Sequence, residues 1–349
     1  MVFVRETNAH IAVWEGLKLT KSEATAVTGI ENVQWTADFE ASFLELTKQV
    51  DNIYINTNEH YRAKVETQTR EDRFIAWCKE QFPKKNYEKS NFILQGLRGI
   101  KDPEEIAHIQ QACDITEKGF KRVLGFVTPG VWEFEIEAEF AHEFLRNRSK
   151  GFAYTPIIAS GANSNVLHYI ENSQQCQAGE LILMDVGAEY GNYSSDMTRT
   201  IPVSGRFTPR QRAVYEAVLK VKDEATQLLM PGVLWKAYHI EVGKLMSSAL
   251  VDVGLLTKKE VSDNAEAYKK YFMHGTSHHL GLDTHDYGLL DEPMEANMVF
   301  TVEPGIYIPN EGFGIRLEDD VVVQATGTPV NLMANIPINP DEIEALMNP

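Results

Sequence analysis

Several features that define common classes of protein are missing from this 349-residue chain. Its three cysteines (Cys78, Cys113 and Cys176) are odd in number and far apart, which excludes a disulfide framework or a cysteine zinc site and favours a reducing cytoplasm. Only 33 lysines and arginines stand against 50 acidic residues, so the net charge of −17 argues against nucleic acid or an anionic membrane as a partner. No apolar run has the length of a membrane helix, and the first residues lack the pattern of a signal peptide. We therefore expect a cytoplasmic protein.

Motifs for nucleotide binding and covalent catalysis are missing as well. No Walker loop, dinucleotide fingerprint, or serine or cysteine nucleophile motif occurs. The hydrophobic content of 43% and the charged content of 24% are nevertheless ordinary for a soluble globular enzyme, and the length suffices for two domains.

The first expected domain covers residues 1–95. Strand candidates at Ile11–Trp14 and Asn52–Ile55 alternate with helix candidates at Asp38–Val50 and Thr67–Phe82. This alternation predicts a small α/β domain.

The second expected domain, residues 96–349, begins with a clear helix start. A strand-like stretch at Phe92–Leu94 leads toward it. Asp102 then stands at the N-cap, Pro103 at the first helical position, and Glu105 where a capping box requires an acid.

This second domain looks duplicated. Pro-Gly-Val sequences at 129–131 and 231–233 each end one helix and are each followed by another, at Phe134–Asn147 and Tyr238–Val253. Each half then runs through a loop that holds a histidine into a hairpin that holds two acids. We expect an α+β fold with a pseudo-two-fold axis, in which helices cover a curved antiparallel sheet and four acids meet at its centre.

The first acidic hairpin contains Asp185 and Asp196. A turn at Tyr190-Gly191 would place these two aspartates directly opposite each other on adjacent strands. The second hairpin contains Glu303 and Glu318, and a four-residue turn at 309–312 would oppose them in the same way.

Opposed like charges repel, so two such pairs in apolar strands call for a cation. One pair alone could face solvent on an edge strand; two pairs with histidines nearby favour a metal site. Four carboxylates and one imidazole suit Mn²⁺, Co²⁺, Fe²⁺ or Zn²⁺. Five ligands exceed what one catalytic zinc takes and fit two ions that share carboxylates and a bridging water. The residues themselves leave His278 and His279 both open as the imidazole, and His60, His108 and His239 are expected at the surface.

From Leu97 to the C-terminus the sequence resembles the pita-bread metallopeptidases, and among them the aminopeptidase P (Xaa-Pro aminopeptidase) family. The motifs that carry the resemblance are the run from Asp185 to Asp196, the run His274-Gly-Thr-Ser-His278, and the segments around Glu303 and Glu318. The resemblance implies a pita-bread catalytic domain over residues 96–349. Members usually carry a longer N-terminal domain, so we expect the domain at residues 1–95 to be shortened.

The resemblance also assigns roles to single residues. It implies that Asp185 binds one metal ion, that His278 and Glu303 bind the other, and that Asp196 and Glu318 bridge both. Glu303 would also move the proton of the attacking water. Other expected site residues surround the ligands: His168, His274 and His285 near the reacting carbonyl and the proline side of the pocket, and Arg316 and Tyr307 behind the ligands.

The implied activity is removal of the N-terminal residue from peptides with proline in the second position, through a hydroxide that bridges two ions, most often Mn²⁺. The implied assembly is a homodimer or homotetramer. Two alternatives stay open: a prolidase that cuts only Xaa-Pro dipeptides, and a pita-bread relative without catalysis that serves as a binding module.

Overall fold

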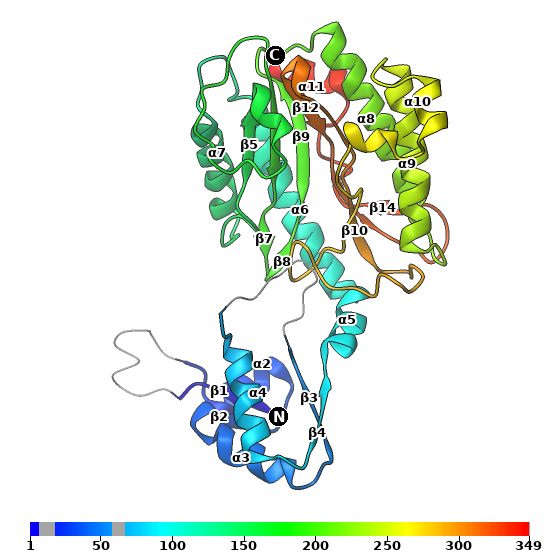
Figure 1. Cartoon of the computed structure of the whole chain (residues 1–349). Helices are drawn as coiled ribbons and strands as arrows, with labels where there is room; N and C mark the ends of the chain where they lie inside the picture. The colour runs from blue at the N-terminus through cyan, green and yellow to red at the C-terminus, as the bar shows by residue number, and fades with distance from the viewer. Residues whose placement is uncertain (7–17, 58–66, 349) are drawn as a thin grey trace. The chain divides into compact units, whose positions relative to one another are not determined.

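The computed structural model describes residues 1–6, 18–57 and 67–348, which form two compact units, Met1–Asn91 and Phe92–Pro349 (Figure 1). The domain boundary that we expect after residue 95 stays a prediction. The expected strand Ile11–Trp14 and His60 lie outside the described residues. No helix among the described residues has both the length and the apolar composition needed to cross a membrane.

The first unit is an α/β arrangement built from two parallel strand pairs, β1 (Val2–Val4) with β2 (Val33–Trp35) and β3 (Asn52–Ile55) with β4 (Asn86–Lys89). Its helices are α2 (Lys21–Thr28), α3 (Phe39–Thr47) and α4 (Arg70–Gln81). The strand predicted at Asn52–Ile55 is confirmed, and α3 and α4 occupy the two predicted helical stretches.

The second unit begins with a helix where a strand-like stretch was expected. Residues Phe92–Leu94 belong to α5 (Asn91–Gly99), so the strand prediction is wrong. Ile93 and Leu97 are four residues apart, a helical spacing that a three-residue apolar run conceals. The next helix, α6 (Pro103–Leu124), has Asp102 as its N-cap and Glu105 in a capping box, as predicted.

The predicted duplication is visible in equivalent hydrogen bonds. Gly130 (φ 99°) donates to the carbonyl oxygen of Cys176, and Gly232 (φ 88°) donates to that of Met294. Each glycine is followed by a helix, which is α7 (Glu133–Arg146) in the first half and α9 (Trp235–Asp252) in the second.

Antiparallel strands of both halves form the centre of this unit. The first half contributes β5 (Ile157–Ser160), β6 (Leu181–Val186) and β9 (Met197–Pro202); the second contributes β10 (Val299–Val302), β13 (Asp319–Val322) and β14 (Val330–Asn331). Short hairpins continue these ladders: β7 (Glu189–Tyr190) with β8 (Tyr193–Ser194), and β11 (Gly305–Ile308) with β12 (Phe313–Arg316).

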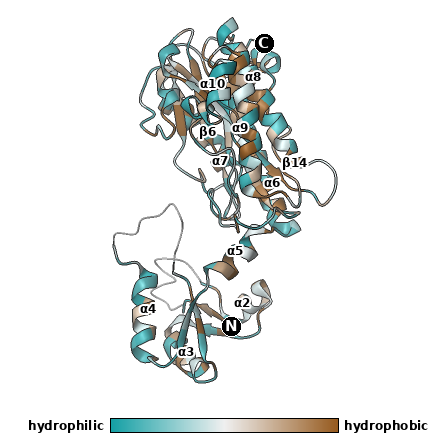
Figure 2. Ribbon diagram, turned by 45° about the vertical axis from the view of Figure 1, so that its right-hand side comes forward, coloured by the Kyte–Doolittle hydropathy of each residue, from teal (hydrophilic) through white to brown (hydrophobic). Residues whose placement is uncertain are grey.

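Helices cover the strands of each half. Figure 1 shows α6 and α7 beside the first half and α8 (Pro209–Gln227) and α9 beside the second. Both hydrophilic and hydrophobic residues occur along α8 and α9, as expected of helices with one buried face (Figure 2). The remaining helices are α10 (Lys258–Asp263) and α11 (Pro340–Met347). This is the predicted pita-bread architecture.

The two acidic hairpins differ in how well their register was predicted. The first turns at Gly191-Asn192, both with positive φ, so Asp185 pairs with Thr198 and the predicted direct pairing with Asp196 is wrong. Glycine and asparagine together suit the left-handed positions of this two-residue turn better than the predicted Tyr190-Gly191. Asp196 is therefore a diagonal neighbour of Asp185.

The second register is confirmed. Gly305 pairs with Arg316 in one ladder and Val302 with Asp319 in the other, around the predicted turn at 309–312. Glu303 and Glu318 occupy the short interruption between these two ladders.

Candidate metal centre

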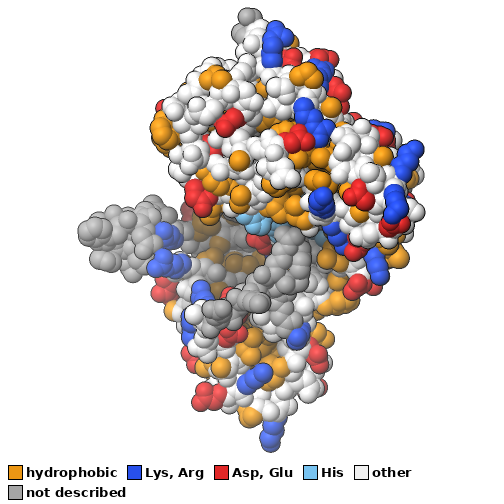
Figure 3. All heavy atoms as spheres, turned by 45° about the horizontal axis from the view of Figure 1, so that its top comes forward, with side chains coloured by type: hydrophobic (Ala, Val, Ile, Leu, Met, Phe, Trp, Pro, Cys, Tyr) orange, Lys and Arg blue, Asp and Glu red, His pale blue; other side chains and the backbone are white. Residues whose placement is uncertain are grey.

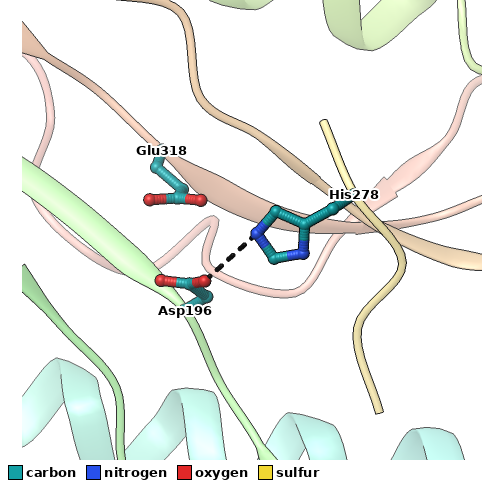
Figure 4. Close-up of side chains that lie close together, drawn as sticks. All are labelled: Asp196, His278 and Glu318. Carbon is teal, nitrogen blue, oxygen red and sulfur yellow. Dashed lines mark ion pairs between the residues drawn. The ribbon is translucent and has the colours of Figure 1, made fainter. Parts of the chain in front are cut away.

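Three of the predicted ligands form a tight buried group. One ligand atom from each of Asp196, His278 and Glu318 lies within 4.8 Å of the others (Figure 4). His278 Nε2 is 3.4 Å from Asp196 Oδ2 and 3.8 Å from Glu303 Oε1, which adds the fourth residue.

The fifth residue, Asp185, joins this group through a tyrosine. The hydroxyl of Tyr154 lies 2.6 Å from Asp185 Oδ1 and 2.5 Å from Asp196 Oδ1. All five side chains predicted as ligands are therefore brought together by β6, β9, the two interrupted strands of the second hairpin and the loop that carries His278. Tyr154 was missed in the sequence because it stands in a loop, outside any motif.

The electrostatics of the acids fit a bound cation. Burial, and then Asp185, raise the pKa of Asp196 well above its ordinary value; burial, and then Asp196, do the same to the pKa of Glu318. Burial also raises the pKa of Glu303 to about 7, although His278 and Arg316 favour its charged form. Within the described part of the chain, Arg316 is the one lysine or arginine that forms an ion pair with any of the four acids.

A neighbouring acid shows the opposite arrangement. Asp319 is as deeply buried as Glu318, but Arg199 and Lys222 both pair with it and hold its pKa below the ordinary value in spite of burial. The fold thus neutralises Asp319 with side chains and leaves the four acids of the site with one arginine. Four hard oxygen ligands and one imidazole suit divalent ions such as Mn²⁺, Co²⁺, Fe²⁺ or Zn²⁺.

Arg316 contacts the predicted ligand Asp185 directly and the predicted ligand Glu318 through Thr198. Its Nη2 donates to Asp185 Oδ2 at 2.5 Å, and its Nε donates to Thr198 Oγ1 at 3.1 Å. Thr198 in turn donates to Glu318 Oε2 at 2.7 Å, so one arginine orients acids from both hairpins. Thr198 was missed, although its position two residues after Asp196 places both on the same face of the strand.

The same arginine reaches a histidine through Tyr307. Arg316 Nη1 lies 3.0 Å from the Tyr307 hydroxyl, which is 2.7 Å from His274 Nε2. His274 Nδ1 is 2.8 Å from the carbonyl oxygen of Gly275 and must donate to it, so Nε2 accepts from Tyr307. Burial, and then Arg316, lower the pKa of His274 to about 3, which keeps this imidazole neutral.

The other histidines fall into two groups. The His285 ring packs at a tilt against His278, with 4.0 Å between ring centroids and 43° between the ring planes. His168 is exposed in the loop after the 3-10 helix Gly161–Asn165, and it is among the neighbours whose electrostatic influence lowers the pKa of His274. Figure 3 shows histidine side chains at the surface of this unit beside hydrophobic side chains.

The histidines outside the site lie only in part where the sequence predicted them. His279 packs on Phe300, with centroids 4.4 Å apart, and is absent from the ligand group, which favours His278 as the imidazole ligand. His108 is exposed as predicted. His239 is half-buried against Trp235, with centroids 4.7 Å apart, so its predicted place at the surface is wrong.

Comparison with known proteins adds independent information. The sequence model described as metallopeptidase family M24 matches residues 107–325, and the one described as aminopeptidase P, N-terminal domain, matches residues 1–54. The Xaa-Pro aminopeptidase of Escherichia coli is 34% identical over 99% of this chain and 82% of its own length. Human Xaa-Pro aminopeptidase 3 is 30% identical over 99% of this chain and 70% of its own length.

Solved structures agree with these matches. The zinc-substituted aminopeptidase P of Escherichia coli in complex with product has a TM-score of 0.88 and 33% identity, and the match covers 99% of this chain and 82% of that one. Proline aminopeptidase P II from Yersinia pestis has a TM-score of 0.86 and 33% identity, over 99% and 83% of the two chains.

Proposed function

Because this chain belongs to the aminopeptidase P family of M24 pita-bread metallopeptidases, we propose that it removes the N-terminal residue from peptides whose second residue is proline. The observation that carries the proposal is the buried group of four carboxylates and one imidazole with a single arginine partner. Relatives named Xaa-Pro aminopeptidases support the choice of substrate.

Five residues would hold the metal ions. We assign Asp185 to one ion, His278 and Glu303 to the other, and Asp196 and Glu318 to both, with Mn²⁺ as the proposed metal. When bound, two divalent ions supply the Lewis acidity that activates water and polarises the scissile carbonyl. Arg316 keeps Asp185 in place, and Thr198 keeps Glu318 in place.

Glu303 is the residue that we propose moves the proton. Its side chain is 19% exposed, so it is the acid of the group that a substrate can reach most readily, with Asp185 next at 14%. It lies 3.6 Å from His274 Nδ1, whose hydrogen is held by the Gly275 carbonyl. A carboxylate in this position can take a proton from water and pass it to the leaving amine nitrogen.

The histidines would surround the substrate. His168, exposed and next to the site, is proposed to donate a hydrogen bond to the oxygen of the scissile carbonyl as negative charge develops there. His285 is proposed to form the wall against which the proline ring packs. His274, neutral and bonded at both nitrogens, is proposed to shape the site beside Glu303.

The test is a set of three substrates offered to the Mn²⁺-loaded protein. We expect release of the first residue from an Xaa-Pro-Yaa tripeptide and much slower release from the matched Xaa-Ala-Yaa tripeptide. Cleavage of Xaa-Pro dipeptide alone would show a prolidase instead. Equal rates on the proline and alanine tripeptides would contradict the proposed specificity.

Two further proposals concern the cellular compartment and the oligomeric state of the protein. The three cysteines are buried and unpaired, which supports a reducing compartment such as the cytoplasm. A homodimer or homotetramer is proposed from the family, and mass measurement in solution would decide it.

A further inference from the structure

Glu133 is a carboxylate buried completely at the first position of α7. Its Oε1 accepts from the backbone N–H and from the hydroxyl of Ser160, both at 2.7 Å. Its Oε2 accepts from the Tyr169 hydroxyl and from the Gln174 N–H, both at 2.8 Å. No lysine, arginine or histidine of the described residues forms an ion pair with it, so neutral donors alone satisfy this buried charge.

All of these donors belong to one loop. Ser160 ends β5, Gln174 follows 14 positions later, and His168 stands between them, directly before Tyr169. Tyr169 is 8% exposed and points to Glu133, whereas His168 is exposed. Hydrogen bonds to this one carboxylate therefore fix both ends of the loop, at Ser160 and Gln174, and also fix Tyr169, the residue next to His168.

The second half of the fold supports its histidine loop from the equivalent position. Three residues after Gly232, α9 begins with Trp235, just as α7 begins with Glu133 three residues after Gly130. The Trp235 ring lies nearly parallel to His279, at 6.3 Å between centroids and 11° between planes. His279 directly follows His278. The first helical residue after each glycine thus contacts the histidine loop of its own half, through hydrogen bonds in one case and aromatic packing in the other.

We infer that Glu133 is a positioning residue for His168: it fixes the loop from Ser160 to Gln174 so that the His168 imidazole stays near His274 of the site. Glu133 touches no substrate itself. The inference rests on the proposed role of His168 at the scissile carbonyl, and it adds a residue far outside the ligand set to the machinery of the reaction.

The decisive variant is Glu133→Gln, which replaces one acceptor oxygen by an amide N–H₂ group. Each oxygen of Glu133 faces a backbone N–H, which can only donate, so either orientation of the glutamine leaves one backbone N–H unpaired. We expect kcat/KM to fall about 10-fold to 100-fold from misplacement of His168, with affinity for Mn²⁺ unchanged.

Two further variants complete the set. Glu135→Gln makes the same chemical change in the same helical turn, where the side chain bonds only to the backbone of Trp132 and glutamine can still accept; it should have wild-type kinetics. Tyr169→Phe removes one hydrogen bond to Glu133 and should change the same quantities to a smaller extent. This milder change keeps the inference testable if Glu133→Gln does not fold.

The readouts are a double-mutant cycle with His168→Ala and the NMR signal of the His168 ring in histidine-labelled protein. We expect Glu133→Gln to shift that signal and to cost nothing further in the His168→Ala background. Losses that multiply in the double variant, or an unmoved signal in folded Glu133→Gln and Tyr169→Phe protein, would overturn the inference. If His168→Ala has wild-type kinetics while Glu133→Gln still moves the signal, the positioning stands and the proposed role of His168 fails.

Discussion

The hydroxyl of Tyr154 lies between Asp185 and Asp196, 2.6 Å from an oxygen of the first and 2.5 Å from an oxygen of the second. The two aspartates are diagonal neighbours in the hairpin, and the tyrosine occupies the space between them. In the protein without metal this neutral hydroxyl contacts both carboxylates and offsets their repulsion. Bound ions would take over that role.

Tyr154→Phe should therefore destabilise the metal-free protein more than the metal-loaded protein. A hydrogen bond to a charged acceptor contributes about 1.5–3 kcal/mol, which is the expected loss in the presence of chelator. Thermal unfolding with chelator and with excess Mn²⁺ measures both states. The matched control is Tyr215→Phe, which loses a buried hydrogen bond to the Ile338 carbonyl and should weaken both states equally. An equal loss in both states for Tyr154→Phe would contradict this view.

Two acids adjacent in the sequence, Glu318 and Asp319, should respond in opposite ways to the same amide substitution. Glu318→Gln replaces a buried carboxyl group with which no described lysine or arginine forms an ion pair and whose charged form burial disfavours, so the metal-free protein should keep or gain stability while metal binding is lost. Asp319→Asn leaves Arg199 and Lys222 buried without their partner and should cost about 3–5 kcal/mol with or without metal. Chemical denaturation and Mn²⁺ titration of both variants check this. A large destabilisation of metal-free Glu318→Gln would argue against a site that needs a cation.

Stability without metal should fall as pH rises from about 4.5 to about 7. The ordinary pKa of glutamate is 4.5 and burial raises that of Glu303 to about 7, so in this range the folded protein keeps a proton that the unfolded chain releases. The loss levels off above pH 7 and amounts to roughly 3 kcal/mol for this one group. The raised pKa values of Asp196 and Glu318 act in the same direction.

Urea unfolding at pH 5 and pH 7.5 in the presence of chelator measures this dependence. Glu303→Gln should reduce this pH dependence, and the part that remains should come from Asp196 and Glu318. With Mn²⁺ present the trend should reverse, because ions bind the deprotonated ligands. A metal-free protein that becomes more stable between pH 5 and pH 7.5 would contradict the electrostatics of the site.

Much of the catalytic unit could be predicted because its signals are local. The capping box of Asp102 and Glu105 lies within one turn of helix, and the repeated Pro-Gly-Val sequences reveal the two halves without any structure. The second hairpin register follows from a single four-residue turn. The types of the acidic and histidine residues and their order along the chain were enough to predict where the buried candidate metal site lies.

The remaining features depend on contacts that the sequence does not encode locally. The first hairpin turn could sit at either of two adjacent positions, and that one-residue difference decides whether Asp185 faces Asp196 or Thr198. The hydrogen bonds of Tyr154 and Glu133 join residues far apart in the chain, such as Asp185 at 31 positions from Tyr154 and Tyr169 at 36 positions from Glu133. An acid at a helix start is ordinary, so nothing in the sequence distinguishes Glu133 from Glu135.

The most direct test is release of the N-terminal residue from an Xaa-Pro-Yaa tripeptide by chelator-stripped protein while Mn²⁺ is added stepwise and bound metal is counted. We expect no release without metal and an activity that reaches its plateau with two ions per chain. Full activity in chelator, or no release from a chain that holds two ions, would contradict a dinuclear metal aminopeptidase.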